Sequence, residues 1–308
     1  MRIFITGAQG FIGRTLTDRY RADGHEVVGV DLAADPDGGV VAGDVSEPGP
    51  WQDHAAGAEV VIHTAALLDN HSPLDRYWAV NVLAVRHVLD AAVDGGARRV
   101  VHLSSVRAYS DVDFPDGVDE HHPVRPDGHR YVDTKVAGEQ VALQAHAAGE
   151  VDVTVIRPGD VYGPRSLPWT IWPVTGIAAG SFAVPADHGV FSPVYVDNLV
   201  DAIVAAAATP AAAGQVLCVT DGVGVPNAEF FGRYAAMVGT ELAQVSMDEL
   251  RQRLDDSGVG ADIADYFRRQ GTYSNAKARH LLGWEPAVDL DEGMRRTEAW
   301  LREAGLLG

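Results

Sequence analysis

Short apolar runs alternate with amphipathic segments along the first half of the chain. Six runs, mostly continuous in valine and isoleucine, are typical of parallel strands that are buried on both faces. They cover Arg2–Thr6, Glu26–Asp31, Val40–Ala42, Glu59–His63, Arg99–Ser104 and Val153–Arg157. Segments with helical periodicity lie between them, at Phe11–Asp23, Asp75–Asp94 and Arg130–Ala148. This alternation predicts an α/β fold with a doubly wound parallel sheet and helices on both of its faces.

The pattern changes after Arg157. Residues 163–190 are rich in proline, glycine and bulky apolar side chains. A helix at Asp197–Ala208 and a strand at Val216–Val219 return to the earlier pattern, and amphipathic helices follow, the last at Leu290–Glu303. We expect a Rossmann-type sheet domain and a smaller, mostly helical C-terminal lobe. The sheet domain would cover residues 1–165 with returning segments near 191–225, and the lobe residues 166–190 and 226–308.

Composition narrows the set of partners. The chain has 24 Lys and Arg against 43 Asp and Glu, a net charge of −19. Such an acidic surface repels phosphate backbones and anionic lipids, so we expect neither nucleic acid nor a membrane as a partner. Cys218 is the only cysteine, which rules out an internal disulfide and fits a reducing compartment. Without a signal-peptide pattern or an apolar run of ~18 residues, we expect a cytoplasmic protein.

A glycine-rich turn connects the first predicted strand to the first helix. Gly7, Gly10 and Gly13 recur at three-residue steps. Glycine allows a tight turn that brings backbone N–H groups close to a pyrophosphate, and the helix N-terminus adds favourable partial charge. Asp31 ends the second strand 18 residues later, about where the acid that binds an adenosine ribose is expected. The following Leu32–Ala34 offer no cation for a 2′-phosphate, which favours NAD over NADP.

Other strand ends extend the predicted cofactor pocket. Asp44 and Val45 follow the third strand, where a carboxylate can accept a hydrogen bond from the adenine amino group. Ala65 and Ala66 follow the fourth strand, and their small side chains would let the chain run beside the cofactor. A solvated loop acid and simple packing are the alternatives. Arg14, just after the glycine-rich turn, is the residue that argues for NADP.

Three residues form a candidate catalytic group. Tyr131 and Lys135 are four positions apart, so they share one face of the predicted helix. A phenol has a pKa near ~10, and a neighbouring ammonium lowers it toward the range of a general base. Such a pair can move a proton to or from an alcohol while hydride moves at the carbinol carbon. Ser105 ends the fifth predicted strand, where its hydroxyl can bind the substrate oxygen.

Taken together, the motifs resemble the extended short-chain dehydrogenase/reductase family. The matching segments are the turn Thr6–Gly13, Asn81-Val82, Ser105 placed 26 residues before Tyr131, Arg157–Pro164, Ser192–Asn198 and the C-terminal stretch Ala276–Gly293. The resemblance implies that the sheet domain binds NAD, that the lobe holds a small alcohol or ketone, and that the chain forms a homodimer. It implies catalysis by Ser105, Tyr131 and Lys135. The implied cofactor contacts are Gly7, Gln9, Gly10, Phe11, Ile12, Asp31, Asp44, Val45, Ala65, Ala66, Tyr131, Lys135, Pro158 and Val161.

The branch of the family follows from a few positions. Val106 and Arg107 stand where dehydratases carry Asp-Glu, which argues against dehydration. Arg157–Asp160 lacks the Asn that epimerases and dehydratases often carry there. Other stretches look most like the 3β-hydroxysteroid dehydrogenase branch. They are Val61–Ala66, Ser192–Asn198 and Gly214–Asp221.

We therefore expect an NAD-dependent enzyme that interconverts a secondary alcohol and a ketone on a bulky, largely apolar, steroid-like or cyclic substrate. A nucleotide-sugar 4-epimerase with tightly bound NAD and a non-catalytic dinucleotide sensor are the alternatives. The apolar segment 163–190 would either line the substrate pocket or pack within the lobe. Expected substrate contacts are Asn70, His71, Val106 and Arg107, and no metal site is expected.

Overall fold

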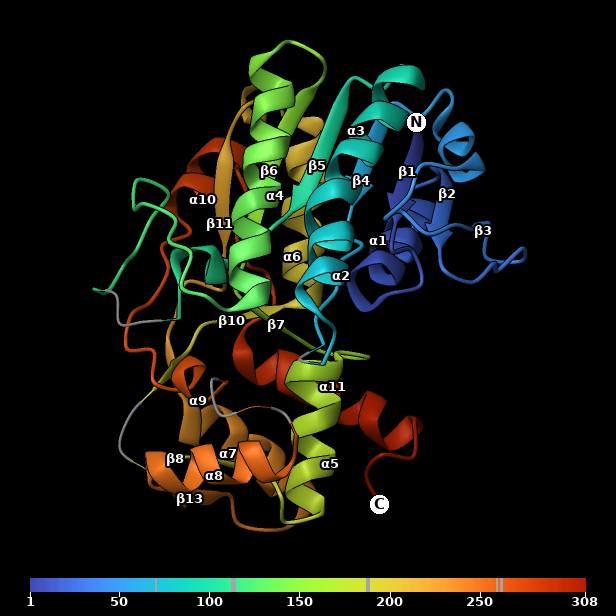
Figure 1. Ribbon diagram of the computed structural model, residues 1–308. Helices are drawn as coiled ribbons and strands as arrows, with labels where there is room; N and C mark the ends of the chain where they lie inside the picture. The colour runs from blue at the N-terminus through green and yellow to red at the C-terminus, as the bar shows by residue number, and fades with distance from the viewer. Residues whose placement is uncertain (70, 112–114, 187–188, 259, 261–262) are drawn as a thin grey trace.

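A seven-stranded parallel sheet forms the centre of the protein. The computed structural model describes residues 1–69, 71–111, 115–186, 189–258, 260 and 263–308. The strand order is β11-β6-β5-β4-β1-β2-β3, so the predicted doubly wound sheet is confirmed (Figure 1). The strands are β1 (Arg2–Thr6), β2 (Glu26–Asp31), β3 (Val40–Ala42), β4 (Val60–His63), β5 (Arg99–Leu103), β6 (Asp152–Pro158) and β11 (Val216–Val219). The order reverses between β1 and β4, and ligands bind at the carboxyl ends of the strands at such a switch point.

Helices cover both faces of the sheet. Figure 1 shows α2 (Leu74–Trp78), α3 (Ala84–Asp94) and α4 (Arg130–Ala147) in front of the sheet and α6 (Val196–Ala208) behind it. The helix α1 (Phe11–Ala22) packs beside α6. Alternate residues of β1 serve the two faces: Phe4 joins the core under α3 and α4, and Ile3 joins the core under α1 and α6. In the described part of the chain, no helix has the length and apolarity needed to cross a membrane.

The predicted helix over residues 75–94 is interrupted. A π-helical turn, η2 (Ala79–Leu83), separates α2 from α3. The buried Asn81 in this turn accepts a hydrogen bond from Leu67 N at 2.8 Å and donates to Leu67 O at 3.2 Å and Thr134 Oγ1 at 3.1 Å. It thereby connects the loop after β4 to α4. A π turn inside a helix often marks a functional site, and this one contacts α4, which carries the predicted Tyr131 and Lys135.

The C-terminal lobe lies below the sheet in Figure 1. Its elements are η4 (Leu167–Ile171), α5 (Trp172–Ala178), β8 (Ala183–Pro185), β9 (Val190–Phe191), β12 (Val225–Pro226), α7 (Asn227–Val238), β13 (Ala243–Val245), α8 (Met247–Asp256) and α9 (Ile263–Tyr266). Between the lobe and the sheet, β7 (Asp160–Tyr162) pairs with β10 (Pro193–Tyr195), and the last helix is α11 (Leu290–Glu303). However, α10 (Ala276–Leu282) packs on β11 and α6, and Lys277 donates to Val216 O at 2.9 Å. The segment 226–308 therefore serves both the lobe and the sheet.

The apolar segment 163–190 contributes to the lobe core. The Trp169 ring lies 5.1 Å from Phe191 and 4.9 Å from Tyr266, measured between ring centroids. Phe182 lies 5.0 Å from Phe231 by the same measure. These contacts favour packing within the lobe over the lining of an apolar substrate pocket.

Candidate active site

The glycine-rich turn after β1 is packed too closely for side chains. Gly7 has a φ of +68°, and a Cβ there would lie 2.8 Å from Ala65 N. A Cβ at Gly13 would lie 2.1 Å from Gly7 O, so α1 could not pack this close to the turn with any other residue. Gly10 adopts an extended conformation at the N-cap of α1. The N-terminus of α1 thus stands directly at the turn, an arrangement that fits a pyrophosphate.

Asp31 is fixed beside this turn by backbone hydrogen bonds. Its Oδ2 accepts from Gln9 N at 2.9 Å and its Oδ1 from Leu32 N at 2.8 Å. The Gln9 side chain donates to Ala33 O at 2.6 Å, which holds the turn against the end of β2. Each carboxylate oxygen can accept a further hydrogen bond, so Asp31 can bind two ribose hydroxyls. The predicted Gly7, Gln9, Gly10 and Asp31 come together, and this cradle fits NAD.

Asp44, predicted to face the adenine, already has partners. Its Oδ1 accepts from Ser46 N at 2.9 Å, and its Oδ2 accepts from Arg76 at 3.0 Å. Burial acts to raise the pKa of Asp44, but the hydrogen bonds from Ser46 and Arg76 outweigh it and lower the pKa. Val45 is buried under α3, and Ala65 and Ala66 are half-buried beside the turn. Sequence reasoning missed Arg76, whose contact with Asp44 has no local motif.

The three predicted catalytic residues converge at the carboxyl end of β5. Ser105 follows this strand, and Tyr131 and Lys135 project from α4. Lys135 Nζ donates to Leu103 O at 2.9 Å and lies 5.7 Å from the centroid of the Tyr131 ring. Burial raises the pKa of Tyr131, while the charge of Arg107 and a hydrogen bond with Ser105 act to lower it. Ser105 Oγ accepts from Arg107 N at 3.1 Å, and Ser105 lies near enough to Tyr131 to act on its pKa.

A buried ion pair between Glu139 and Arg157 lies next to Lys135. Glu139, one turn further along α4, accepts from Arg157 Nε at 2.8 Å and Nη2 at 2.6 Å, and also from Ser104 Oγ. Burial lowers the pKa of Lys135 to about 8, and the charge of Glu139 opposes this fall. Glu139 thus favours the ammonium form of a lysine that has little contact with water.

Two histidines lie side by side in the central strands next to Lys135. His63 and His102 occupy paired positions on β4 and β5, with ring centroids 5.4 Å apart. Thr6 Oγ1 lies 2.6 Å from His63 Nδ1. Burial and the charge of Lys135 lower the pKa of His63 to about 3 and the pKa of His102 well below its ordinary value. Both rings are therefore neutral and add no second charge near Lys135.

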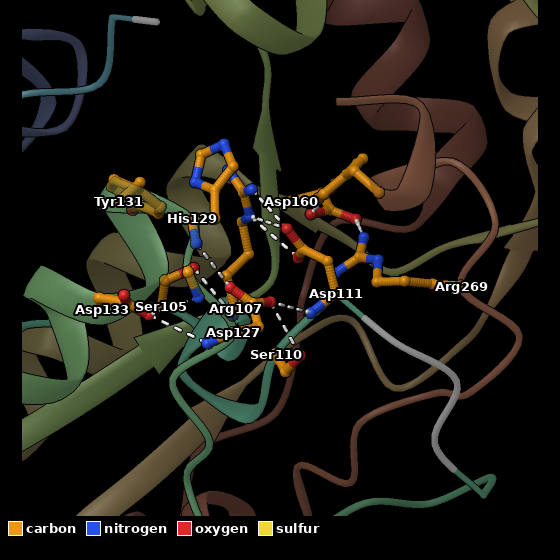
Figure 2. Close-up of polar contacts among 12 residues, drawn as sticks. Ser105, Arg107, Ser110, Asp111, Asp127, His129, Tyr131, Asp133, Asp160 and Arg269 are labelled. Atoms are coloured by element: carbon orange, nitrogen blue, oxygen red, sulfur yellow. Dashed lines mark hydrogen bonds and ion pairs between the residues drawn. The ribbon is translucent and has the colours of Figure 1, made fainter. Parts of the chain in front are cut away.

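Charged side chains cluster next to Tyr131 (Figure 2). The Arg107 guanidinium pairs with Asp111 and lies 5.1 Å from the centroid of the Tyr131 ring. Arg269, from the segment after α9, pairs with Asp160 at 2.7 Å, and both side chains are almost fully buried. Arg107 was predicted as a substrate contact, and its position beside Tyr131 is compatible with that role. Arg269 was missed because Asp160, its ion-pair partner, is distant in sequence.

The other predicted site residues have different positions. Val106, predicted as a substrate contact, has its side chain fully buried in a small core cluster with Tyr109 and Cys218. His71 is exposed, with its N–H donating to Asp69 at 2.8 Å. Asn70 lies outside the described residues. Four further predicted cofactor contacts lie at the carboxyl ends of the central strands. Phe11 and Ile12 are half-buried at the start of α1, and Pro158 and Val161 are buried around the end of β6.

Comparisons with known proteins agree with this geometry. Residues 3–219 match the profile of the NAD dependent epimerase/dehydratase family. The UDP-glucose 4-epimerase of Mycolicibacterium smegmatis is 31% identical, over 98% of this chain and 99% of that protein. A 3beta-hydroxysteroid-dehydrogenase/decarboxylase of Arabidopsis thaliana is 27% identical, over 95% of this chain and 78% of that protein. The structure of MoeE5 in complex with UDP-glucose and NAD superposes with a TM-score of 0.82 at 26% identity and covers 99% of both chains.

These matches extend over nearly the whole chain. They include a UDP-glucose 4-epimerase at higher identity than the steroid dehydrogenase. The chain therefore belongs to the NAD-dependent epimerase/dehydratase family of extended short-chain dehydrogenases/reductases.

Proposed function

We propose that this protein interconverts a secondary alcohol and a ketone, with Tyr131 as the general acid and base. The observation that carries the proposal is the convergence of Ser105, Tyr131 and Lys135 at the end of β5. The glycine-rich turn leaves the same edge of the sheet at the end of β1, two strands away. Neighbouring strands are ~4.8 Å apart, so a cofactor held at the turn can reach the Tyr131 hydroxyl.

Each residue has a defined task in this reaction. NAD, when bound, would supply the hydride acceptor for oxidation of the carbinol carbon and the hydride donor for reduction. Ser105 Oγ holds the substrate oxygen by a hydrogen bond. Tyr131 Oη takes the hydroxyl proton during oxidation and returns it to the carbonyl oxygen during reduction. The Lys135 ammonium stabilises the phenolate form of Tyr131.

The surroundings of Tyr131 favour a polar substrate. The Arg107–Asp111 pair lies beside Tyr131 with side chains 16% and 10% exposed, and a steroid ring would cover these charges without offering them hydrogen bonds. A hydroxylated substrate of the sugar type can donate to Asp111 and accept from Arg107. The similarity to a UDP-glucose 4-epimerase supports this class. The apolar cyclic substrate expected from the sequence has its support in the similarity to the Arabidopsis steroid dehydrogenase.

A nucleotide-sugar 4-epimerase is the second candidate, supported by the same M. smegmatis relative. An epimerase oxidises and re-reduces its substrate in place, whereas a dehydrogenase releases reduced cofactor. Dehydration is disfavoured, since Val106 and Arg107 provide no carboxyl acid or base after Ser105. A homodimer, a cytoplasmic location and the division of the chain near residues 165, 190 and 225 remain predictions from the sequence.

The test compares Tyr131→Phe with the wild type on a panel of nucleotide sugars, sugar alcohols and sterols. Absorbance of free NADH identifies a dehydrogenase, and sugar isomerisation without net NADH identifies an epimerase. Tyr131→Phe should still bind NAD in calorimetry but lose turnover by about 10²–10⁴-fold. Tyr20→Phe is the matched control: its buried hydroxyl has no hydrogen-bond partner in the described structure, so activity should be unchanged. Equal turnover of Tyr131→Phe and the wild type would refute the proposed mechanism.

A further inference from the structure

Arg107 lies between two aromatic rings from different parts of the protein. Its guanidinium carbon is 5.1 Å from the centroid of the Tyr131 ring and 5.2 Å from the centroid of the Tyr266 ring. Tyr131 belongs to the catalytic helix α4, and Tyr266 ends α9 in the C-terminal lobe. A cation at this distance from an aromatic face is held by the ring quadrupole. Arg107 therefore connects the general base to the lobe.

Further contacts fix this arrangement from both sides. On one side, Asp111 accepts from Arg107 Nε at 3.0 Å and from Nη2, as Figure 2 shows. On the other side, the Tyr266 hydroxyl donates to Asp160, which pairs with Arg269 at 2.7 Å. The Arg269 guanidinium carbon lies 3.9 Å from the centroid of the Tyr266 ring. Tyr266 is thus held between two arginines, and Arg107 between two tyrosines.

The charges around Tyr131 act in opposite directions. Arg107 is the foremost cation acting to lower the pKa of Tyr131, while the carboxylates of Asp111 and Asp160 act to raise it. Lys135 on α4 donates a hydrogen bond from its ammonium to Leu103 O. The Lys135 Nζ atom lies 5.7 Å from the centroid of the Tyr131 ring. Other charged and titratable groups of this cluster are Arg269 and Tyr266 from the lobe, Tyr77 on α2 and His129 just before α4.

We propose that Arg107 is a positioning residue for the general base, a second cation that stabilises the Tyr131 phenolate and is held in place by Tyr266 of the C-terminal lobe. The proposal rests on the proposed function, because it requires Tyr131 to act as a base. It explains why an arginine occupies a position that a dehydratase would use for an acid. It also means that the contact of Tyr266 with Arg107 contributes to the stability of the Tyr131 phenolate.

The test is an NMR titration of protein labelled with [ζ-¹³C]tyrosine, without substrate. Tyr131→Phe assigns the Tyr131 resonance among the nine tyrosines. Arg107→Gln should raise the pKa of Tyr131 by about one unit or more, because a nearby favourable charge is lost. Asp111→Asn should shift it in the opposite direction, because it leaves the charge of Arg107 unopposed. Arg86→Gln, a surface arginine on α3 paired with Asp90, should leave it unchanged.

Variants of Tyr266 test the role of the lobe. Tyr266→Phe keeps the ring and should keep the Tyr131 titration, whereas Tyr266→Leu should shift it in the same direction as Arg107→Gln. The proposal is overturned if Arg107→Gln folds and leaves the pKa of Tyr131 unchanged or lowers it. It is also overturned if Asp111→Asn raises the pKa or leaves it unchanged, a result that stands even if Arg107→Gln does not fold. Because no turnover is measured, failure of the proposed reaction would be seen separately, as wild-type protein with a responsive Tyr131 and no oxidoreductase activity.

Discussion

Replacing Lys135 with methionine is expected to make the folded protein more stable while it removes the activity. Lys135 is almost fully buried, and within the described part of the chain its ammonium donates one hydrogen bond, to Leu103 O at 2.9 Å. Methionine keeps the length of the aliphatic chain and removes the charge. Glu139 keeps its partners Arg157 and Ser104 in the variant, so no carboxylate is left without a partner.

The magnitude follows from the pKa of Lys135. Burial lowers this pKa from 10.5 to about 8. Each pKa unit corresponds to ~1.36 kcal/mol, so holding the ammonium in the folded state costs about 3 kcal/mol at pH 7. Removing the ammonium also removes its hydrogen bond to Leu103 O, which reduces the gain in stability by about 1 kcal/mol. Lys135→Met should therefore raise the free energy of unfolding by about 2 kcal/mol at pH 7.

The pH dependence has a defined sign. Between pH 8 and 10.5 the unfolded wild-type chain binds more protons at Lys135 than the folded protein does, so wild-type stability rises with pH in this window. The variant lacks this gain. Its advantage should be complete below pH 8 and should disappear as the pH approaches 10.5.

Urea unfolding followed by tryptophan fluorescence at pH 7, 8, 9 and 10 measures both effects. Lys277→Met is the matched control, since Lys277 also donates to a backbone carbonyl at 2.9 Å but is only half-buried. It should give no stabilisation. A Lys135→Met protein that is less stable than the wild type at pH 7, or an advantage that does not decline toward pH 10, would show that the buried ammonium carries no such cost. Turnover should fall by about 10²-fold or more, because the phenolate of Tyr131 loses its partner.

Three further substitutions test the packing of the site. Gly13→Ala places a Cβ 2.1 Å from Gly7 O, so it should cost ~1–3 kcal/mol of stability in urea unfolding and weaken NAD binding in calorimetry; unchanged NAD affinity would contradict the cradle. Gly232→Ala, in α7 with open space around its Cβ, should instead stabilise the protein by ~0.5–1 kcal/mol in the same assay, and a loss would contradict this. Glu139→Gln leaves the buried Arg157 charge uncompensated and should cost ~3–5 kcal/mol; a loss below 1 kcal/mol would mean that water reaches the pair.

Much of the sheet could be predicted because its signals are local. The strand at Glu26–Asp31 and the helix starting at Phe11 were found with the correct first residues, since continuous Val and Ile runs and a glycine-rich turn need no tertiary context. The proximity of Ser105 and Tyr131 could also be inferred, because a strand end and the face of the following helix meet at one edge of the sheet.

Features that depend on distant contacts could not be predicted. The π turn containing Asn81 follows from its bonds to Leu67 and Thr134, which the helical periodicity of its own segment does not reveal. Likewise, Arg107 owes its position to Tyr266, which is separated from it by more than half of the chain. The burial of Val106 could not be predicted either, because its neighbours in sequence lie in the candidate site while its own side chain packs with Tyr109 and Cys218.

The position of β11 at the edge of the sheet has a consequence for synthesis on the ribosome. This strand pairs with β6 through Val216↔Val155 and Leu217↔Ile156, although about 60 residues separate the two strands in the chain. Until that later segment has emerged, the nascent chain carries β6 as an unpaired edge rich in valine and isoleucine. Such an edge can pair with another nascent chain on the same polysome. Chaperone demand should therefore be highest after β6 has left the ribosome and before β11 pairs with it. It should fall once β11 covers β6, because the outer side of β11 donates to Glu120 and accepts from Lys277.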